Sequence, residues 1–256
     1  MLPYVVSADI SLLLGEWAVK RGFILPQQEF FRELREEFQA HMGQIFKSFE
    51  FVSEDELRVG LERLVKESGL PAVSLDRVYF RSRPNLEVCR LVDQKGDNRG
   101  LGNRFGALPL PEQFRRLQGF KEVVLVDDVV WTGDLMAMVC QNLAEMDIQV
   151  PLICAGIQIE KVETRNGFRG SQWLKEVTGI EIRSVRSYEE VTDQVCERDF
   201  YPGVPLSGRQ LTGSENVGVP YLLPFGKPGE WASIPEDWEL PFSKFCIRQT
   251  VKLFEE

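Results

Sequence analysis

Residues 123–136 read VVLVDDVVWTGDLM and place two adjacent carboxylates, Asp127 and Asp128, at the end of an apolar run. The apolar residues before the acids have the composition of a buried strand, and Gly133 is followed by apolar residues at helical spacing. This stretch predicts a strand over residues 122–126, then a turn, and then a helix from about residue 133 to residue 145.

The same alternation continues further along the chain. The sequence predicts a strand over residues 150–159, a short helix around Trp173 and a strand over residues 180–185. Fully apolar strands that alternate with amphipathic helices are typical of a parallel sheet covered on both faces. We therefore expect an α/β fold over residues 71–190, with a mainly parallel sheet flanked by helices.

The segments on either side of this core have a different character. Residues 1–70 have the apolar spacing of helices, and Ser53 with Glu56 makes a capping box for a helix that ends at Gly69. Residues 191–256 are rich in proline, glycine and aromatic residues, which is typical of an irregular cap or hood. The expected organisation is an N-terminal helical segment, the α/β core and a C-terminal cap.

Two further features are expected between residue 70 and the quoted stretch. Residues 77–82 and 86–92 have strand composition and are separated by a short turn, which predicts a hairpin. Residues 93–111 lose the apolar periodicity and are rich in glycine. They predict a long, mobile and locally basic loop with three cationic side chains, Lys95, Arg99 and Arg104.

Composition limits the kinds of partner. The formal net charge of −9 over 256 residues disfavours general binding to nucleic acid or to acidic membranes. Five cysteines without metal-ligand spacing are typical of reduced intracellular thiols. Because the sequence shows neither a secretory leader nor an apolar run of about 18 residues, we expect a cytoplasmic location.

The position of Asp127 and Asp128 points to two possible roles. Ligands of parallel sheets bind at the carboxyl ends of the strands, and the first amides of the following helix lack intrahelical acceptors and can hold a phosphate. The carboxylates could then accept hydrogen bonds from sugar hydroxyls. Alternatively, the pair only terminates a buried strand and caps the helix. Residue types and spacing leave both interpretations open.

Four apolar residues, two acids, two apolar residues and then Thr132 and Gly133 resemble the phosphoribosyl-pyrophosphate signature of the type I phosphoribosyltransferases. The resemblance implies that Asp127 and Asp128 bind the ribose hydroxyls of phosphoribosyl pyrophosphate. It also implies that the 5-phosphate is bound by the turn and the first helical residues, which are Val129, Val130, Trp131, Thr132, Gly133, Asp134 and Leu135.

The resemblance also concerns the reacting parts of the ligand. It implies that the basic loop closes over the pyrophosphate through Lys95, Arg99 and Arg104, and that Mg²⁺ enters with phosphoribosyl pyrophosphate. No protein side chain is directly assigned to the metal. A hood selects a nucleobase-like substrate in this family, and the candidate contacts are Trp131, Phe200 and Tyr201. A packing role for Trp131 is equally open, and anchoring of the tail in the core is the favoured role of Phe200 and Tyr201.

These implications define one expected function and two alternatives. The expected function is a phosphoribosyltransferase, a glycosyltransferase of nucleotide metabolism that transfers ribose 5-phosphate to a nucleobase or similar nucleophile. The first alternative is a non-catalytic sensor of nucleotide or phosphoribosyl pyrophosphate. It is favoured by departures from the family pattern: Trp131 and Leu135 in the cradle, the negative Asp134, and acidic residues 53–56 where a pyrophosphate loop is typical. The second alternative function is that of an interaction protein whose terminal segments bind a partner. A homodimer is also left open.

Overall fold

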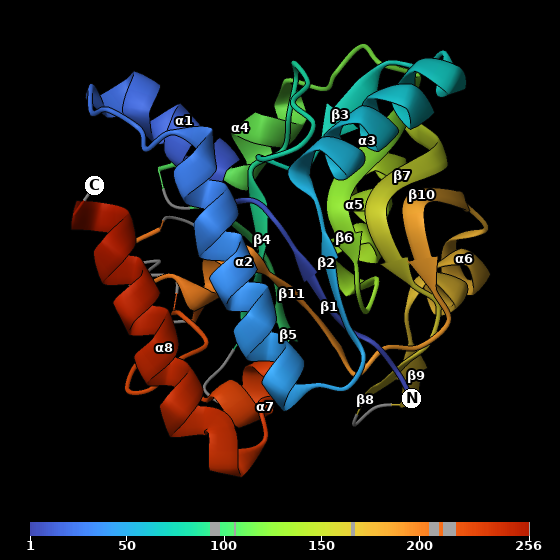
Figure 1. Ribbon diagram of the computed structural model, residues 1–256. Helices are drawn as coiled ribbons and strands as arrows, with labels where there is room; N and C mark the ends of the chain where they lie inside the picture. The colour runs from blue at the N-terminus through green and yellow to red at the C-terminus, as the bar shows by residue number, and fades with distance from the viewer. Residues whose placement is uncertain (93–97, 105, 165–166, 205–209, 212–218, 256) are drawn as a thin grey trace. The chain divides into compact units, whose positions relative to one another are not determined.

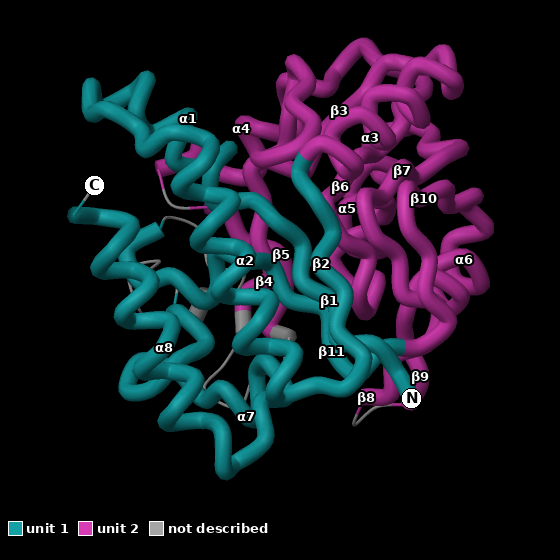
Figure 2. Tube along the Cα trace, viewed as in Figure 1, with its two compact units in different colours: residues 1–54, 191–208, 218–256 teal, residues 55–190, 209–217 magenta. Residues whose placement is uncertain are grey.

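The computed structural model describes residues 1–92, 98–104, 106–164, 167–204, 210–211 and 219–255. The chain forms two compact units (Figure 2). Unit 1 consists of residues 1–54, 191–208 and 218–256, and unit 2 of residues 55–190 and 209–217. The sequence analysis placed the first division at residue 70, whereas the units divide after Glu54.

The centre of unit 2 is a four-stranded parallel sheet (Figure 1). In spatial order its strands are β10 (Glu181–Tyr188), β7 (Gln149–Ile159), β6 (Glu122–Val130) and β3 (Ala72–Ser74). The apolar run at the start of β6 is completely buried, as a strand covered on both faces requires. The predicted fold class, an α/β fold with a mainly parallel sheet flanked by helices, is confirmed.

Three helices provide the layers of this fold. α5 (Asp134–Ala144) and α6 (Ser171–Thr178) share one buried apolar cluster with β6 and β7. α3 (Glu54–Ser68) packs on β10 and β7, where Gly60 lies against Val185 and Leu57 lies against Gly156. The apolar residues of α3 and α5 recur every three or four positions, so each helix buries one face against the sheet.

The segment between β3 and β6 differs from the prediction. β4 (Val88–Val92) pairs antiparallel with β5 (Asn98–Asn103), so the predicted hairpin partner, residues 77–82, was wrong. The predicted loop over residues 93–111 was also partly wrong, because its described residues include β5 and the start of α4 (Leu110–Arg115). Gly102 shows why the loop prediction was wrong. A Cβ at this position would come within 2.7 Å of Leu91, so the glycine allows β5 to pack against β4 and does not mark a loop.

Two small pairings complete the described part of unit 2. β12 (Gln210–Leu211) pairs parallel with β4. β8 (Val162–Thr164) and β9 (Gly167–Arg169) form an antiparallel pair between β7 and α6. This pair brings Arg169 to the start of α6.

Unit 1 contains a second parallel sheet with the order β11-β1-β2. Its strands are β1 (Tyr4–Ser7), β2 (Phe49–Val52) and β11 (Asp193–Cys196). The helices of this unit are α1 (Ile10–Arg21), α2 (Gln28–Ile45), a 3₁₀ turn (Glu197–Phe200), α7 (Pro228–Ala232) and α8 (Glu236–Glu255). The N-terminal segment is therefore not only helical, and the C-terminal segment contains a 20-residue helix.

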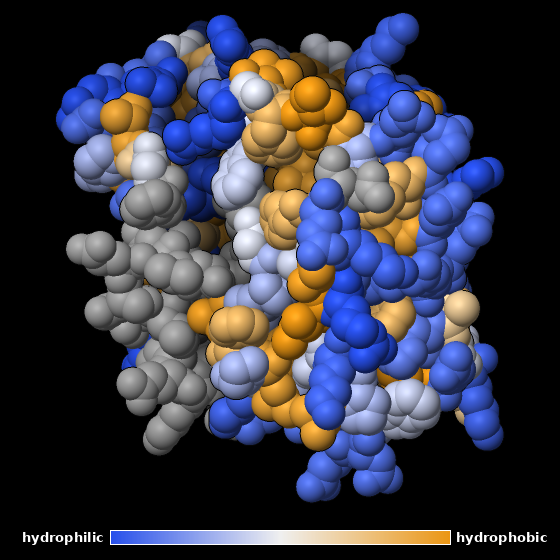
Figure 3. All heavy atoms as spheres, turned by 60° about the vertical axis from the view of Figure 1, so that its left-hand side comes forward, coloured by the Kyte–Doolittle hydropathy of each residue, from blue (hydrophilic) through white to orange (hydrophobic). Residues whose placement is uncertain are grey.

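Apolar side chains occur on the surface as well as in the cores. α8 exposes Leu240, Ile247, Val251 and Phe254. Figure 3 shows apolar residues in orange interspersed with polar residues in blue on one face of the molecule. Among the residues that the structure describes, no helix combines the length and the apolar character needed to cross a membrane.

Candidate functional site

Asp127 and Asp128 lie inside β6, which continues to Val130 and is four residues longer than predicted. Beyond Val126, β6 keeps its neighbour β7, with Asp127 opposite Ala155, but it loses its other neighbour because β3 ends at Ser74. The two acids therefore lie on the part of β6 that has β7 on one side and no longer has β3 on the other. Asp127 is buried (5% exposed) and Asp128 is half-buried.

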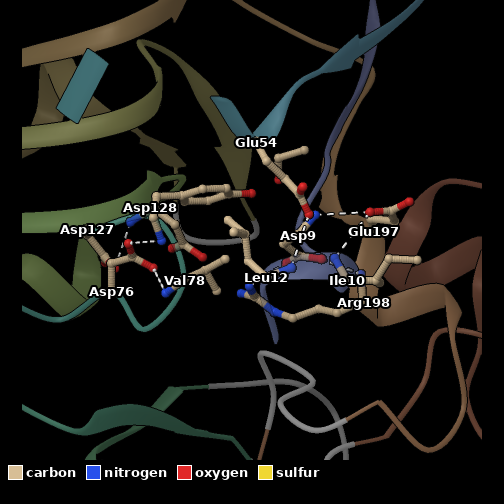
Figure 4. A network of polar contacts seen from close by, with 12 residues as sticks. Asp9, Ile10, Leu12, Glu54, Asp76, Val78, Asp127, Asp128, Glu197 and Arg198 are labelled. Carbon is tan, nitrogen blue, oxygen red and sulfur yellow. Dashed lines mark hydrogen bonds and ion pairs between the residues drawn. The ribbon is translucent and has the colours of Figure 1, made fainter. Parts of the chain in front are cut away.

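A third acid, Asp76, belongs to the same group (Figure 4). It follows β3 by two residues, and the parallel pairing of Ser74 with Val126 brings it level with Asp128. Its carboxylate accepts hydrogen bonds from the amides of Val78 (2.7 Å), Tyr79 (2.7 Å) and Phe80 (2.6 Å). Asp76 thus shapes the loop after β3 and explains why residues 77–82 form a turn instead of the predicted strand.

Burial and mutual repulsion raise the pKa of these carboxyls. The pKa of Asp76 is raised to about 6, first by burial and then by the charge of Asp128. The pKa of Asp127 is raised well above its usual range by burial, by Asp128 and by Asp76, while Arg104 opposes the shift. The group therefore carries negative charge at a high electrostatic cost, and hydrogen-bond donors or cations supplied by a ligand would lower that cost.

Arg104 is anchored next to this group. Its Nε donates to the carbonyl of Val88 (2.7 Å) and its Nη2 donates to the carbonyl of Leu75 (3.0 Å). These bonds join the end of the β4–β5 pair to the loop after β3. The structure thus places Arg104 as a fixed cation near Asp127, whereas the sequence analysis predicted a residue of a mobile loop.

The turn after β6 consists of residues 131–133. Val129 and Val130 precede it inside the sheet, where they pair with Ile157 and Gln158. Their contact with a phosphate stays a prediction. Gly133 has a φ of 81°, and a Cβ there would meet the Cβ of Leu174 at 3.0 Å. Glycine is required at this position by both conformation and space.

The first amides of α5 follow this turn directly. The helix begins at Asp134, so the amides of Asp134 and Leu135 belong to its first turn, where intrahelical acceptors are lacking. The Thr132 hydroxyl oxygen accepts a bond from the amide of Asp134 (3.5 Å) and one from Nη1 of Arg90 (3.4 Å). Thr132 can still donate its own hydroxyl proton to a ligand oxygen. Trp131 is half-buried beside this turn.

The sequence analysis missed two arginines, Arg90 and Arg169. Arg90 belongs to β4 and contacts Thr132, whereas Arg169 belongs to β9 and faces Asp134, with 3.6 Å between Nε and Oδ1. The negative charge that Asp134 brings to the turn is therefore balanced by Arg169. Neither arginine is near the turn in sequence, so only the positions of β4 and β9 in the folded chain could have identified them.

The loop after β3 is also basic. It carries Arg77, Arg81 and Arg83, and Arg77 forms an ion pair with Glu87 (3.3 Å). Because β3 and β6 are parallel neighbours, this loop leaves the sheet at the same edge as Asp127 and Asp128. The sequence offered one signal for it, since Asp76 follows the apolar end of β3 much as Asp127 follows the apolar run of β6.

The remaining predicted contact residues are Lys95, Arg99, Phe200 and Tyr201. Lys95 lies outside the described residues. Arg99 is exposed within β5. Phe200 and Tyr201 belong to the buried core of unit 1, where the Phe200 ring lies 5.0 Å from Phe242 and 5.8 Å from Phe38. The favoured interpretation of both residues as core anchors is confirmed, because Phe200 is 0% and Tyr201 is 1% exposed.

No side-chain metal centre is present in the described ranges, in which no three His, Cys, Asp or Glu residues are arranged to hold an ion. The half-buried carboxylate of Asp128 is a suitable oxygen donor for Mg²⁺, but a single donor does not build a site. A divalent ion at this edge would therefore need most of its ligands from a bound molecule and from water.

Acidification is expected to stabilise the ligand-free protein. The unfolded pKa of an aspartate is near 3.9 and that of folded Asp76 is about 6, so between these values the folded state binds more protons. Stability should therefore rise as the pH falls through 6, and Asp76 should contribute about 1.4 kcal/mol by pH 5.0. Urea unfolding at pH 7.5 and pH 5.0 measures the change.

Asp128→Asn provides the control for this expectation. The variant removes the like charge that raises the pKa of Asp76 and Asp127 without removing any acceptor of the loop amides. Its gain in stability on acidification should be smaller than that of the wild type. An equal gain in both proteins would contradict the assigned repulsion.

Comparison with known proteins adds no family assignment: no protein-family model matches the chain, and no curated protein is similar enough to be matched.

Proposed function

We propose that the chain is a cytoplasmic phosphoribosyltransferase that transfers ribose 5-phosphate from phosphoribosyl pyrophosphate to a nucleobase-like nucleophile and releases pyrophosphate. One observation carries the proposal. Two adjacent carboxylates on the central strand β6 come directly before a glycine turn and a helix start, at the edge where β3 has ended. This order supplies acceptors for sugar hydroxyls next to donors for a phosphate.

Asp127 and Asp128 hold the ribose in the proposed complex. Hydrogen bonds from the 2- and 3-hydroxyls are most favourable to charged carboxylates, and the two carboxylates here lie close enough to repel each other. The turn residues Thr132 and Gly133 and the first amides of α5 bind the 5-phosphate. Fixing the sugar at both ends orients C1 for attack and lowers the entropy cost of the reaction.

In the proposed complex, the loop after β3 supplies positive charge near C1 of the ribose, where the pyrophosphate leaves. Arg77, Arg81 and Arg83 lie on a loop that begins beside Asp128, and they can neutralise the departing pyrophosphate. When bound, Mg²⁺ screens the same charge. The ion would enter with phosphoribosyl pyrophosphate, and no side chain among the described residues is assigned to it.

A sensor without turnover is the second candidate. Trp131 and Leu135 offer no hydroxyl to the phosphate, and Phe200 and Tyr201 are packed in the core of unit 1, so no hood residue for a base is assigned. Such a protein would bind phosphoribosyl pyrophosphate with the same residues but would release no product.

A binding and turnover experiment tests both candidates. Phosphoribosyl pyrophosphate with Mg²⁺ should raise the melting temperature, because a ligand that binds only the folded state stabilises it by mass action, and adenosine triphosphate should raise it less. Pyrophosphate release is then measured with a panel of purine, pyrimidine and pyridine bases. Release with any base supports the enzyme, and binding without release supports the sensor. No thermal shift at millimolar ligand would eliminate both.

A further inference from the structure

Arg169 has a defined position beside the turn that follows β6. The amide of Gly170 donates to the carbonyl of Thr132 (3.1 Å), and Gly133 packs against Leu174. These contacts fix the start of α6 on the turn. The guanidinium carbon of Arg169 lies 4.5 Å from the ring centroid of Trp173, so the ring supports the guanidinium by a cation–π contact.

The hydrogen-bonding capacity of Arg169 is only partly used. Nη1 donates to the carbonyl of Phe168 (3.1 Å), and Nε lies 3.6 Å from Oδ1 of Asp134, which is an ion pair longer than a hydrogen bond. Its Nη2 has no hydrogen-bond partner among the residues that the structure describes. The side chains of Arg169 and Asp134 are 26% and 27% exposed, so a ligand can reach both.

We propose that Arg169 determines specificity for a phosphorylated sugar by binding its 5-phosphate, and that Asp134 is the counter-ion of Arg169 while the ligand is absent. This inference rests on the proposed function and adds a residue to it. A phosphate dianion offers several oxygens to a guanidinium and can replace one loosely placed carboxylate. A neutral sugar cannot, and it would leave the ion pair intact.

Asp134 sharpens this selection because its charge repels any anion that does not engage Arg169. The Thr132 hydroxyl belongs to the same turn and Nη1 of Arg90, from β4, contacts it, so both groups can donate to a phosphate there. Arg169 differs from the loop arginines after β3, which serve the pyrophosphate in the proposed reaction. The two groups of arginines should therefore respond to different parts of the ligand.

The test measures the affinities of purified variants for ribose 5-phosphate, pyrophosphate and phosphoribosyl pyrophosphate by calorimetry. Arg169→Gln should weaken binding of ribose 5-phosphate and of phosphoribosyl pyrophosphate by at least about tenfold and leave pyrophosphate binding unchanged. Asp134→Asn should strengthen ribose 5-phosphate binding severalfold, since the competing carboxylate is removed. Arg169→Lys, which keeps the charge but loses the planar fork, should give an intermediate loss.

Arg183→Gln is the matched control, because Arg183 is an exposed arginine of unit 2 that pairs with Glu181 (2.8 Å). It should bind all three ligands as the wild type does. Unchanged ribose 5-phosphate binding by Arg169→Gln, or an equal loss for pyrophosphate, would overturn the inference and leave the proposed function standing. Binding of ribose 5-phosphate that depends on Arg169, without any binding of phosphoribosyl pyrophosphate, would support the inference and overturn the proposed function.

Discussion

Replacing Asp127 and Asp128 together by asparagine is expected to weaken binding of phosphoribosyl pyrophosphate by at least about tenfold. A hydrogen bond to a charged group contributes roughly 1.5–3 kcal/mol, and about 1.4 kcal/mol corresponds to a tenfold change in affinity. Asparagine keeps an acceptor, which offsets part of the loss. The melting temperature of the free protein should stay the same or rise, because the repulsion that raises the pKa of Asp76 is relieved.

Calorimetric titration and thermal unfolding of the double variant measure the two effects. Glu189→Gln with Glu190→Gln is the matched control, since these adjacent acids of unit 2 are exposed and carry the same charge. The control should bind the ligand as the wild type does. If the Asp127 and Asp128 double variant instead loses on the order of 1 kcal/mol of stability and keeps its affinity, the pair serves the fold and the site assignment is wrong.

Arg35→Met is expected to lower the stability of unit 1 by about 3–5 kcal/mol. Arg35, on α2, donates to both oxygens of Glu197 (Nε–Oε1 3.1 Å, Nη2–Oε2 3.0 Å) and to Glu54 (2.7 Å), as ion pairs within one network. Glu197 is completely buried and also accepts from the amide of Asp9 (3.0 Å), which precedes α1 (Figure 4). Removing the guanidinium would leave a buried carboxylate without its cation.

Urea unfolding measures this loss, and two variants make it specific. Arg58→Met removes an arginine that pairs with Asp55 (3.2 Å) and Glu62 (3.4 Å) on the surface of α3, and its cost should be much smaller because solvent screens exposed ion pairs. Adding Glu197→Gln to Arg35→Met removes the unpaired charge and should recover part of the stability. A similar cost for Arg58→Met and Arg35→Met would show that burial of the network contributes little.

The sequence could predict the elements whose pattern is local. The alternation of strands and helices from β6 to β10 was visible because β6 and β7 contain continuous apolar runs and α5 has a distinct apolar face. The capping box at Ser53 likewise predicted the start of α3 at Glu54. The position of Asp127 at the open edge followed from the rule for parallel sheets, although the extra length of β6 did not.

The missed features depend on contacts between distant residues. β1 pairs Tyr4 with Asp193, and neither short strand has a pattern of its own long enough to identify it. Gly102 looks like a loop residue until Leu91 is seen beside it. Arg169 reaches Asp134 only because β9 and α6 return to the turn after β6. Such side chains acquire their roles from the fold, so sequence spacing alone does not reveal them.

Unit 1 is assembled from three separate segments of the chain, and this has a consequence for folding during synthesis on the ribosome. β1 is the middle strand of its sheet and gains β2 early, but β11 ends only at Cys196. At roughly 5–20 residues per second, on the order of ten seconds or more passes between synthesis of β1 and of its second neighbour. During that interval residues 55–190 of unit 2 have been made, while one edge of β1 has no strand to pair with. A nascent chain with this arrangement would be a substrate for chaperones that cover exposed strand edges until residue 196 emerges.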